Sequence, residues 1–306
     1  FKSLLNLANS EKRDKFDKIG VMGIGFNSVF HITDVSSIIS GSSYVLIDPH
    51  ARGYCNLPPG QRGFKGDFVE HDLIKKFPDQ FTPFSVALNN SLDEFYNGTI
   101  FRYSLRTKLD ASESEISEKI YRIDQIKEMF ETFFQVDNIT CLMFLKYIER
   151  ISFYEIEKGQ TIPKLLYQIE VTNAKEISDK RKLLANNIMS IIKSPTNTGA
   201  FETIYKMKFC QSSSQSNIKS EWLIINYIAD VNDKTYAKFK NYIRDCKFVP
   251  NVGLAARIDD VSKNKGKLYC FLPLPGYKDD FSVSVNGCFA VSKNRRNLEV
   301  SMDEDL

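Results

Sequence analysis

Three closely spaced glycines that precede a helix-like pattern constrain this chain more than any other feature. The glycines are Gly20, Gly23 and Gly25. Apolar residues follow at positions 26, 29 and 30, which is the spacing of a helix with one buried face. A backbone without side chains at a helix start lets unpaired N–H groups approach an anion, so the cluster predicts a phosphate-binding loop. The structural alternative is that Gly20 ends a preceding helix and Gly23 and Gly25 allow tight helix packing.

This cluster differs from the two common glycine-rich phosphate loops. The dinucleotide-binding loop has the spacing G-x-G-x-x-G after a buried strand, whereas the residues before Gly20 are charged and helical in pattern. The P-loop ends in Gly-Lys-Ser or Gly-Lys-Thr, and no such ending is present here. A phosphate-binding role therefore requires a different fold.

Composition limits the class of protein. The chain has 306 residues, of which 42% are hydrophobic, so we expect it to bury two cores. Its 41 Lys and Arg and 38 Asp and Glu leave a net charge of +3, which disfavours a nucleic-acid partner. The six cysteines and three histidines form no C-x-x-C or H-x-x-x-H pair, which disfavours a zinc site. We expect a cytoplasmic protein without a membrane partner, because no long apolar run or signal segment is present.

Helical and alternating patterns follow one another along the chain and predict an α/β fold with two domains, 1–110 and 111–306. We expect strands over residues 43–48, 99–106, 139–145, 151–156, 165–171, 201–209, 221–228 and 268–274. Helices are predicted over residues 112–134, with a capping box at Ser112 and Glu115, 175–192 and 233–246. Residues 50–94 are predicted to be largely irregular. Asn97-Gly98 predicts a turn, and Asn286-Gly287 a hairpin between residues 281–285 and 288–292.

Several blocks of residues resemble the sacsin repeat, in its chaperone-like ATPase region. The blocks are residues 19–34, Ser40-Gly41, Asp48-Pro49-His50, 76–84, 97–106, 270–275, Val285-Asn286-Gly287 and Asn294-Arg295-Arg296. They follow in the family's order from one end of the chain to the other. Sacsin repeats are grouped with the heat-shock chaperones and other GHKL ATPases. The resemblance therefore implies a two-layer α/β sandwich of the Bergerat type, incomplete at its amino end, followed by a second α/β domain.

The resemblance also implies a nucleotide site with ATP and Mg²⁺ as cofactors. It assigns nucleotide binding to Gly20, Gly23, Ile24, Gly25 and Phe26 in the lid and helix start, and to Thr99 near the adenine end. In the family, the catalytic glutamate, the magnesium-binding asparagine and an adenine-reading aspartate precede the glycine lid. They would therefore precede Phe1, and no catalytic or metal-binding residue is assigned within this chain.

Other polar residues carry weaker hypotheses. Related ATPases extend a basic residue from the second domain to the γ-phosphate, so Arg295 or Arg296 is a candidate for that contact. The alternative is that these arginines form a solvated turn. Asp34 and Asp48 occupy ordinary turn positions, and His31 is interpreted as a packing or capping residue.

Three functions remain open on the sequence. The first is a sacsin-like, chaperone-type ATP-binding module in which nucleotide state moves the first domain against the second to handle protein clients or co-chaperones. The second is a scaffold that keeps the fold without binding nucleotide, which is favoured by Val21 and Met22 where relatives usually carry a basic residue and a phenylalanine. The third is a DNA-linked GHKL ATPase, which the near-neutral charge and the downstream blocks disfavour.

Overall fold

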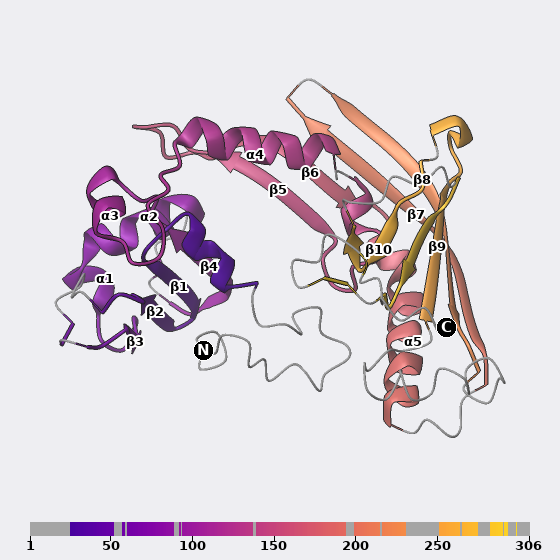
Figure 1. The fold of residues 1–306 in the computed structure, drawn as a ribbon, viewed down its shortest axis with the longest axis horizontal. Helices are drawn as coiled ribbons and strands as arrows, with labels where there is room; N and C mark the ends of the chain where they lie inside the picture. Colours follow the sequence, from indigo (N-terminus) through magenta and orange to yellow (C-terminus); the bar gives the residue numbers. More distant parts are fainter. Residues whose placement is uncertain are drawn as a thin grey trace, which may run out of the picture. The chain divides into compact units, whose positions relative to one another are not determined.

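The computed structural model describes residues 25–51, 57–58, 60–88, 92, 94–136, 139–193, 199–214, 216–230, 251–263, 265–274, 282–289, 291–292 and 298. The fold is mixed α/β, as predicted (Figure 1). The chain divides into two compact units. Unit 1 contains the described residues of 23–131 and 154–164, and unit 2 those of 132–153 and 165–306. None of the described helices is long and apolar enough to span a membrane.

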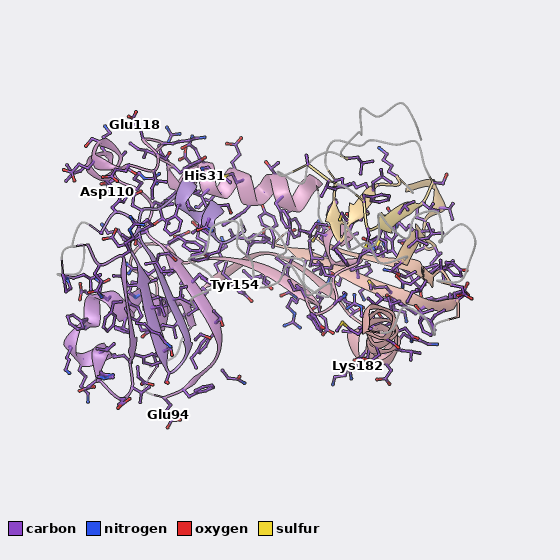
Figure 2. The ribbon with its side chains drawn as sticks, turned by 60° about the horizontal axis from the view of Figure 1, so that its bottom comes forward. His31, Glu94, Asp110, Glu118, Tyr154 and Lys182 are labelled. Carbon is purple, nitrogen blue, oxygen red and sulfur yellow. The ribbon has the colours of Figure 1, made fainter. Side chains whose placement is uncertain are left out.

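Unit 1 is built on a four-stranded antiparallel sheet with the order β3-β2-β1-β4. The strands are β1 (Ser36–Gly41), β2 (Ser43–Ile47), β3 (Gly63–Asp67) and β4 (Tyr96–Tyr103). The helices are the 3₁₀ helix η2 (Asn27–His31), α1 (Leu73–Lys76), α2 (Pro78–Leu88) and α3 (Lys108–Glu113). Figure 2 shows Glu94 at one end of this unit and Asp110 and Glu118 at the other.

Both faces of the unit 1 sheet are covered by apolar side chains. Neighbouring residues of a strand point to opposite faces, so adjacent apolar residues in β1 and β2 serve two clusters. One cluster joins the sheet to α1 and α2 through Ile39, Tyr44, Leu46, Leu73, Phe81 and Phe84. The other joins it to η2 through Ile38, Val45, Ile47 and Phe30. The sheet is therefore a central layer, which explains why β1 and β2 are buried along most of their length.

The prediction that residues 50–94 are largely irregular is wrong, because this segment contains β3, α1 and α2. Pro78 occupies the first position of α2, where the missing N–H has no helical partner to lose. Phe81 and Phe84 lie three residues apart on α2 and are each 1% exposed. Burial of these two rings against Tyr44 stabilises α2. This helix was not predicted, because the prolines of the segment indicated an irregular structure.

The turn predicted at Asn97-Gly98 is also wrong, because both residues lie inside β4. The pairing of β1 with β4 shifts at this point, from Ser40 opposite Thr99 to Gly41 opposite Tyr96. The two extra residues on β4 form a β-bulge, which accommodates turn-prone residues without ending the strand.

The single long helix predicted over residues 112–134 is divided in the structure. The capping box is formed by Thr107 and Asp110, which exchange backbone-to-side-chain hydrogen bonds of 3.2 and 2.8 Å at the start of α3. The helix ends at Ser114, whose hydroxyl accepts hydrogen bonds from the Ile116 and Ser117 N–H groups. Such local bonds compete with helical ones, and the next helix, α4, spans Ile123–Val136.

Unit 2 contains an eight-stranded sheet with the order β11-β10-β12-β9-β8-β7-β6-β5. The strands are β5 (Arg150–Glu155), β6 (Lys164–Val171), β7 (Phe201–Ser213), β8 (Asn217–Ile228), β9 (Asn251–Arg257), β10 (Leu268–Cys270), β11 (Leu272–Pro273) and β12 (Ser284–Gly287). Strands β6 to β9 pair antiparallel, whereas β10 and β12 pair parallel. The helices are α5 (Ala174–Lys193) and the 3₁₀ helices η3 (Ile139–Leu142) and η4 (Val261–Lys263).

The core of unit 2 lies on one face of this sheet. Its fully buried side chains include Leu142, Met143, Ile169, Met207, Phe209, Ile224 and Tyr269. Trp222, the chain's single tryptophan, is 6% exposed in the same cluster. Figure 2 shows Lys182 on the side of α5 that points away from the sheet, and its side chain is 72% exposed.

The predictions for β5 to β8 and α5 are confirmed, but two others in unit 2 are wrong. The strand predicted over residues 139–145 begins as the 3₁₀ helix η3, because a short buried apolar run has no periodicity that separates helix from strand. The hairpin predicted at Asn286-Gly287 is absent, since both residues lie within β12 and pair with β9. The helix predicted over residues 233–246 lies outside the described residues.

A carboxylate ties the end of β9 to β8 and makes stability depend on pH. Asp259 accepts hydrogen bonds from the Arg257 guanidinium at 3.0 and 2.8 Å and from the Glu221 N–H at 2.9 Å. The bonds from Arg257, aided by that from Glu221, outweigh partial burial and lower the pKa of Asp259 to about 2.

Asp259→Asn is expected to destabilise unit 2 by about 1 kcal/mol near pH 7, a value reduced because the carboxylate is partly exposed. The folded-state pKa lies below the unfolded one, so this stability is present above about pH 4 and is lost as pH falls toward 2. Urea unfolding followed by Trp222 fluorescence measures the difference between variant and parent. Asp179→Asn, at a carboxylate that is 95% exposed, is the control. A pH-independent difference for Asp259→Asn would contradict the assignment.

Candidate functional site

The segment that follows the glycine cluster packs against one face of the unit 1 sheet. The Phe26 ring lies 6.0 Å from the Phe101 ring of β4 and 5.9 Å, edge to face, from the Phe30 ring of η2, measured between centroids. Phe30 is buried, and Phe26 and Val29 pack against its cluster. The apolar spacing at these three positions thus predicted their packing, although the helix is a short 3₁₀ helix.

Thr99 lies on that same face. Its partner across the sheet is Ser40, and the two hydroxyl oxygens are 2.8 Å apart. Phe101 is two residues further along β4 and pairs with Ile38. Because alternate residues share a face, these four side chains form one surface, which we call the Thr99 face.

The structure thus brings two parts of the predicted nucleotide site to one surface. Gly25 is exposed, and a Cβ placed on it would meet no atom within 4 Å, so the backbone there borders open space. Thr99 is also exposed. The other predicted site residues, Gly20, Gly23, Ile24, Arg295 and Arg296, lie outside the described residues.

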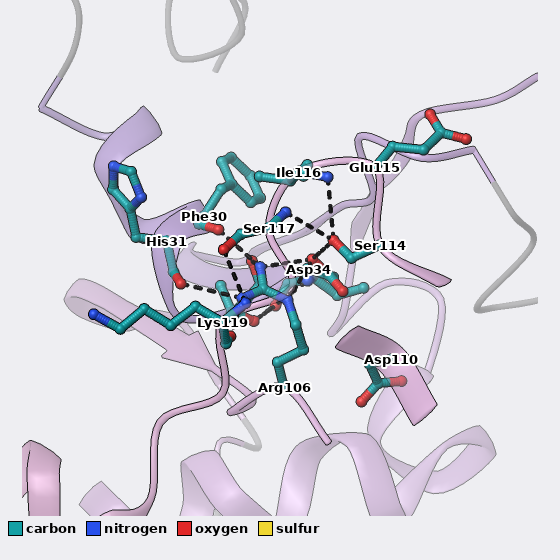
Figure 3. Close-up of polar contacts among 12 residues, drawn as sticks. Phe30, His31, Asp34, Arg106, Asp110, Ser114, Glu115, Ile116, Ser117 and Lys119 are labelled. Atoms are coloured by element: carbon teal, nitrogen blue, oxygen red, sulfur yellow. Dashed lines mark hydrogen bonds and ion pairs between the residues drawn. The ribbon is translucent and has the colours of Figure 1, made fainter. Parts of the chain in front are cut away.

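A buried ion pair anchors the segment that carries Phe26. Arg106, just after β4, is 3% exposed, and Asp34, just after η2, is 5% exposed. The Arg106 Nε and Nη2 atoms donate to Asp34 Oδ1 at 3.0 and 2.8 Å (Figure 3). The pair joins residues 72 positions apart, and no local pattern in the sequence indicated it.

Arg106 also binds backbone carbonyl groups at the end of η2. Its Nη2 atom donates to the Phe30 and Thr33 carbonyls at 2.9 and 3.3 Å, and Nη1 donates to those of His31 and Lys119 at 3.1 and 2.8 Å. All three guanidinium nitrogens therefore have partners (Figure 3). Since Arg106 has no free donor, its role is to position η2 rather than to bind a ligand.

The surroundings of Asp34 keep its carboxylate ionised. Burial by itself raises the pKa of Asp34, but the hydrogen bonds from Arg106 and from Ser114 Oγ, at 2.9 Å, lower it by more. The net result is a pKa below the ordinary value. Asp34 was predicted to be an ordinary turn residue, and the structure shows that it is also the acceptor at the centre of a buried network.

The Asp48-Pro49-His50 block lies beside this network. The His50 Nε2 atom is 3.5 Å from Asp34 Oδ1, and its side chain is 2% exposed. Asp48 is fully buried, and its Oδ1 atom accepts a hydrogen bond from the His50 N–H at 3.1 Å. Three sequence blocks that carry the family resemblance therefore meet at this end of the unit 1 sheet.

A cavity of unit 1 lies on the sheet face opposite to Thr99. It has a volume of about 220 Å³ and is lined by Ser37, Leu46, Gln80, Arg102, Ser104 and Asp110, among others. Arg102 and Phe101 are neighbours on β4 and therefore point to opposite faces. This cavity does not coincide with the surface shared by Gly25, Phe26 and Thr99. Within the described ranges, no three His, Cys, Asp or Glu side chains gather to hold a metal ion.

The amino-acid sequence is similar to those of known proteins. The family model for the sacsin domain matches residues 1–168, more than half of the chain. The chain belongs to the sacsin family. This sacsin-family chain is 31% identical over 315 aligned residues to human sacsin, across 96% of its own length. The alignment covers 7% of human sacsin, so the chain spans a small fraction of that relative's length. The region matched by the sacsin domain contains η2, β1 to β4 and the Arg106–Asp34 pair.

Proposed function

We propose that unit 1 is a chaperone-type ATP-binding module of the Bergerat type, with nucleotide bound over the Thr99 face. The observation that carries the proposal is the contact of Phe26 with Phe101. This contact fixes the end of the glycine segment on the face that presents Thr99. Gly20, Gly23, Ile24 and Gly25 would offer backbone N–H groups to the phosphates of ATP, with Mg²⁺ beside them.

The chemistry of the described surface fits the adenine end of a nucleotide. Phe101 is 41% exposed and offers an apolar ring surface beside the hydroxyls of Thr99 and Ser40. A purine has a flat apolar face and a polar edge, so it could contact both kinds of group at once. No residue of the described surface is assigned to metal binding or to proton transfer, and the proposal therefore concerns binding rather than hydrolysis.

Nucleotide binding would act on the rest of the protein through η2. Arg106 donates hydrogen bonds to the carbonyls of Phe30, His31 and Thr33. A shift of Phe26 on nucleotide binding would therefore act on η2, whose end is held by Arg106. We propose that nucleotide state moves the first domain against the second to handle protein clients or co-chaperones in the cytoplasm. Arg295 or Arg296 would then contact the γ-phosphate from the second domain.

Thr99→Val is expected to weaken ATP binding about tenfold, because it removes the hydrogen bond proposed between Thr99 and the base while keeping the shape of the side chain. Titration calorimetry with ATP and Mg²⁺ measures the affinity, on protein that carries any natural sequence preceding Phe1. Thr82→Val is the matched control, since this threonine is exposed on α2 and its one described side-chain hydrogen bond is to the Pro78 carbonyl. Equal affinities for both variants and the parent would overturn the placement of the base.

A scaffold that binds no nucleotide is the second candidate. The Ser40 and Thr99 hydroxyls already bond each other, so each has a hydrogen-bond partner without a ligand. Val21 and Met22 favour the same interpretation. The scaffold predicts no measurable heat of ATP binding at millimolar nucleotide, whereas the ATP-binding module predicts saturable binding that Thr99→Val weakens.

A further inference from the structure

We propose that a cavity in unit 2 binds a small oxyanion of the phosphate class between Arg181 and Lys146. The cavity has a volume of about 40 Å³. Arg181 comes from α5, and Lys146 follows η3. Every residue that lines the cavity belongs to unit 2, so this inference is independent of the ATP site proposed for unit 1.

The guanidinium of Arg181 indicates that an anion is needed. Its Nη1 atom is buried and has no hydrogen-bond partner among the described residues. Its Nη2 atom contacts the Met207 sulfur at 3.9 Å, a weak acceptor. An arginine side chain stays charged in proteins, and a buried donor without an acceptor costs free energy. An oxyanion in the cavity would supply both the acceptor and the opposite charge.

The cavity wall is basic. Lys146 lines it together with Arg181, and its ammonium group lies 5.7 Å from the centroid of the Phe271 ring, which is also part of the wall. No aspartate or glutamate is found among the described lining residues. An oxyanion in the cavity would be attracted by both cationic side chains of its wall.

Amide side chains complete the wall. Asn226 of β8 and Asn286 of β12 both lie opposite Gly253 of β9 in the sheet, so the two amides flank a position without a side chain. A Cβ at Gly253 would come within 2.9 Å of the Phe144 ring and 3.1 Å of Asn226 Oδ1, so glycine is needed here for these two lining side chains to keep their positions.

Asn251 adds a second unpaired group. Its Oδ1 atom is buried without a partner among the residues described. The oxygen and nitrogen of an amide can exchange places with no change of shape, which would turn Nδ2 into the cavity as a donor. The wall would then present guanidinium, ammonium and amide donors, the set that binds phosphate in proteins.

The size of the cavity restricts the ligand. One water occupies roughly 10–15 Å³ on this scale, so about 40 Å³ holds a few atoms rather than a nucleotide. The ligand is therefore inorganic phosphate, or the terminal phosphate of a monoester whose remaining atoms stay outside.

The test titrates the full chain with inorganic phosphate at constant ionic strength, with chloride as the balancing anion. Trp222 fluorescence follows thermal unfolding of unit 2. Phosphate is expected to raise the unfolding midpoint of the parent, and Arg181→Met is expected to weaken phosphate binding at least tenfold. Lys182→Met, at the neighbouring lysine that is exposed and points away from the sheet, is expected to respond like the parent (Figure 2).

A second readout separates loss of the site from loss of the fold. In phosphate-free buffer, Arg181→Met is expected to unfold no earlier than the parent, because it removes an unpaired buried donor. If that variant does not fold, Lys146→Met is used in the same phosphate titration to test whether the cavity binds phosphate.

A titration with glycerol 2-phosphate in place of phosphate distinguishes the end group of a monoester from the free ion. An equal phosphate shift in parent and Arg181→Met, or no shift in either at 10 mM, would overturn the proposal and leave water as the occupant.

Discussion

Arg106→Met is expected to destabilise unit 1 by about 3–5 kcal/mol, the cost of removing one partner from a buried ion pair. The variant leaves the Asp34 carboxylate buried without its cation and removes the donor from the Phe30 and Thr33 carbonyls. Hydrogen exchange of the β1 and β4 amides measures the loss in unit 1. Trp222 fluorescence reports on unit 2 in the same sample and is expected to change little.

Arg102→Met is the matched control for this prediction. Arg102 lies on the same strand, but its one described hydrogen bond is a long one, 3.4 Å to Gln80 Oε1. Its replacement is expected to change stability by less than about 0.5 kcal/mol. The double variant Arg106→Met with Asp34→Leu is expected to recover part of the loss, because neither charge remains buried. Equal destabilisation by Arg102→Met and Arg106→Met would show that the network around Asp34 has no special role.

Phe81→Ala is expected to destabilise unit 1 by about 3–5 kcal/mol, as is typical when a large ring is removed from a core. Phe81 is 1% exposed, and its ring centroid lies 4.9 Å from that of Tyr44 and 6.0 Å from that of Phe68. The variant leaves a cavity between α2 and the sheet. Urea unfolding followed by hydrogen exchange in β2 and α2 measures the effect.

Phe77→Ala separates this packing effect from a general loss of aromatic surface. Phe77 lies at the end of α1, four residues before Phe81, and is 52% exposed. Its removal is expected to cost less than about 0.5 kcal/mol. If both variants lost the same stability, the packing of α2 against β2 described here would be incorrect.

The elements that the sequence predicted well are those with a regular period and one buried face. α5 spans twenty residues with helical spacing, and β7 and β8 alternate over most of their length. β1 was missed because Ile38 and Ile39 are adjacent and serve opposite faces of a sheet covered on both sides, which removes the alternation.

Predictions from local turn sequences were wrong where pairing with distant strands determined the structure. Asn97-Gly98 and Asn286-Gly287 are turn-prone pairs, yet the first forms a bulge in β4 and the second lies in β12 between two neighbouring strands. The Arg106–Asp34 pair could not be predicted from spacing, because its residues belong to different elements. The family resemblance included both residues in its blocks, but it carried no information on their contact.

In the proposed function, Gly25, Phe26 and the Thr99 face form one nucleotide site. Hydrogen exchange of the protein, with any natural sequence that precedes Phe1, tests it most directly when measured with and without ATP and Mg²⁺. Slower exchange is expected at the amides of residues 25–30 and 99–101, with no change in α2 on the opposite face of the sheet. Saturable ATP binding that leaves both of these segments unprotected would contradict it.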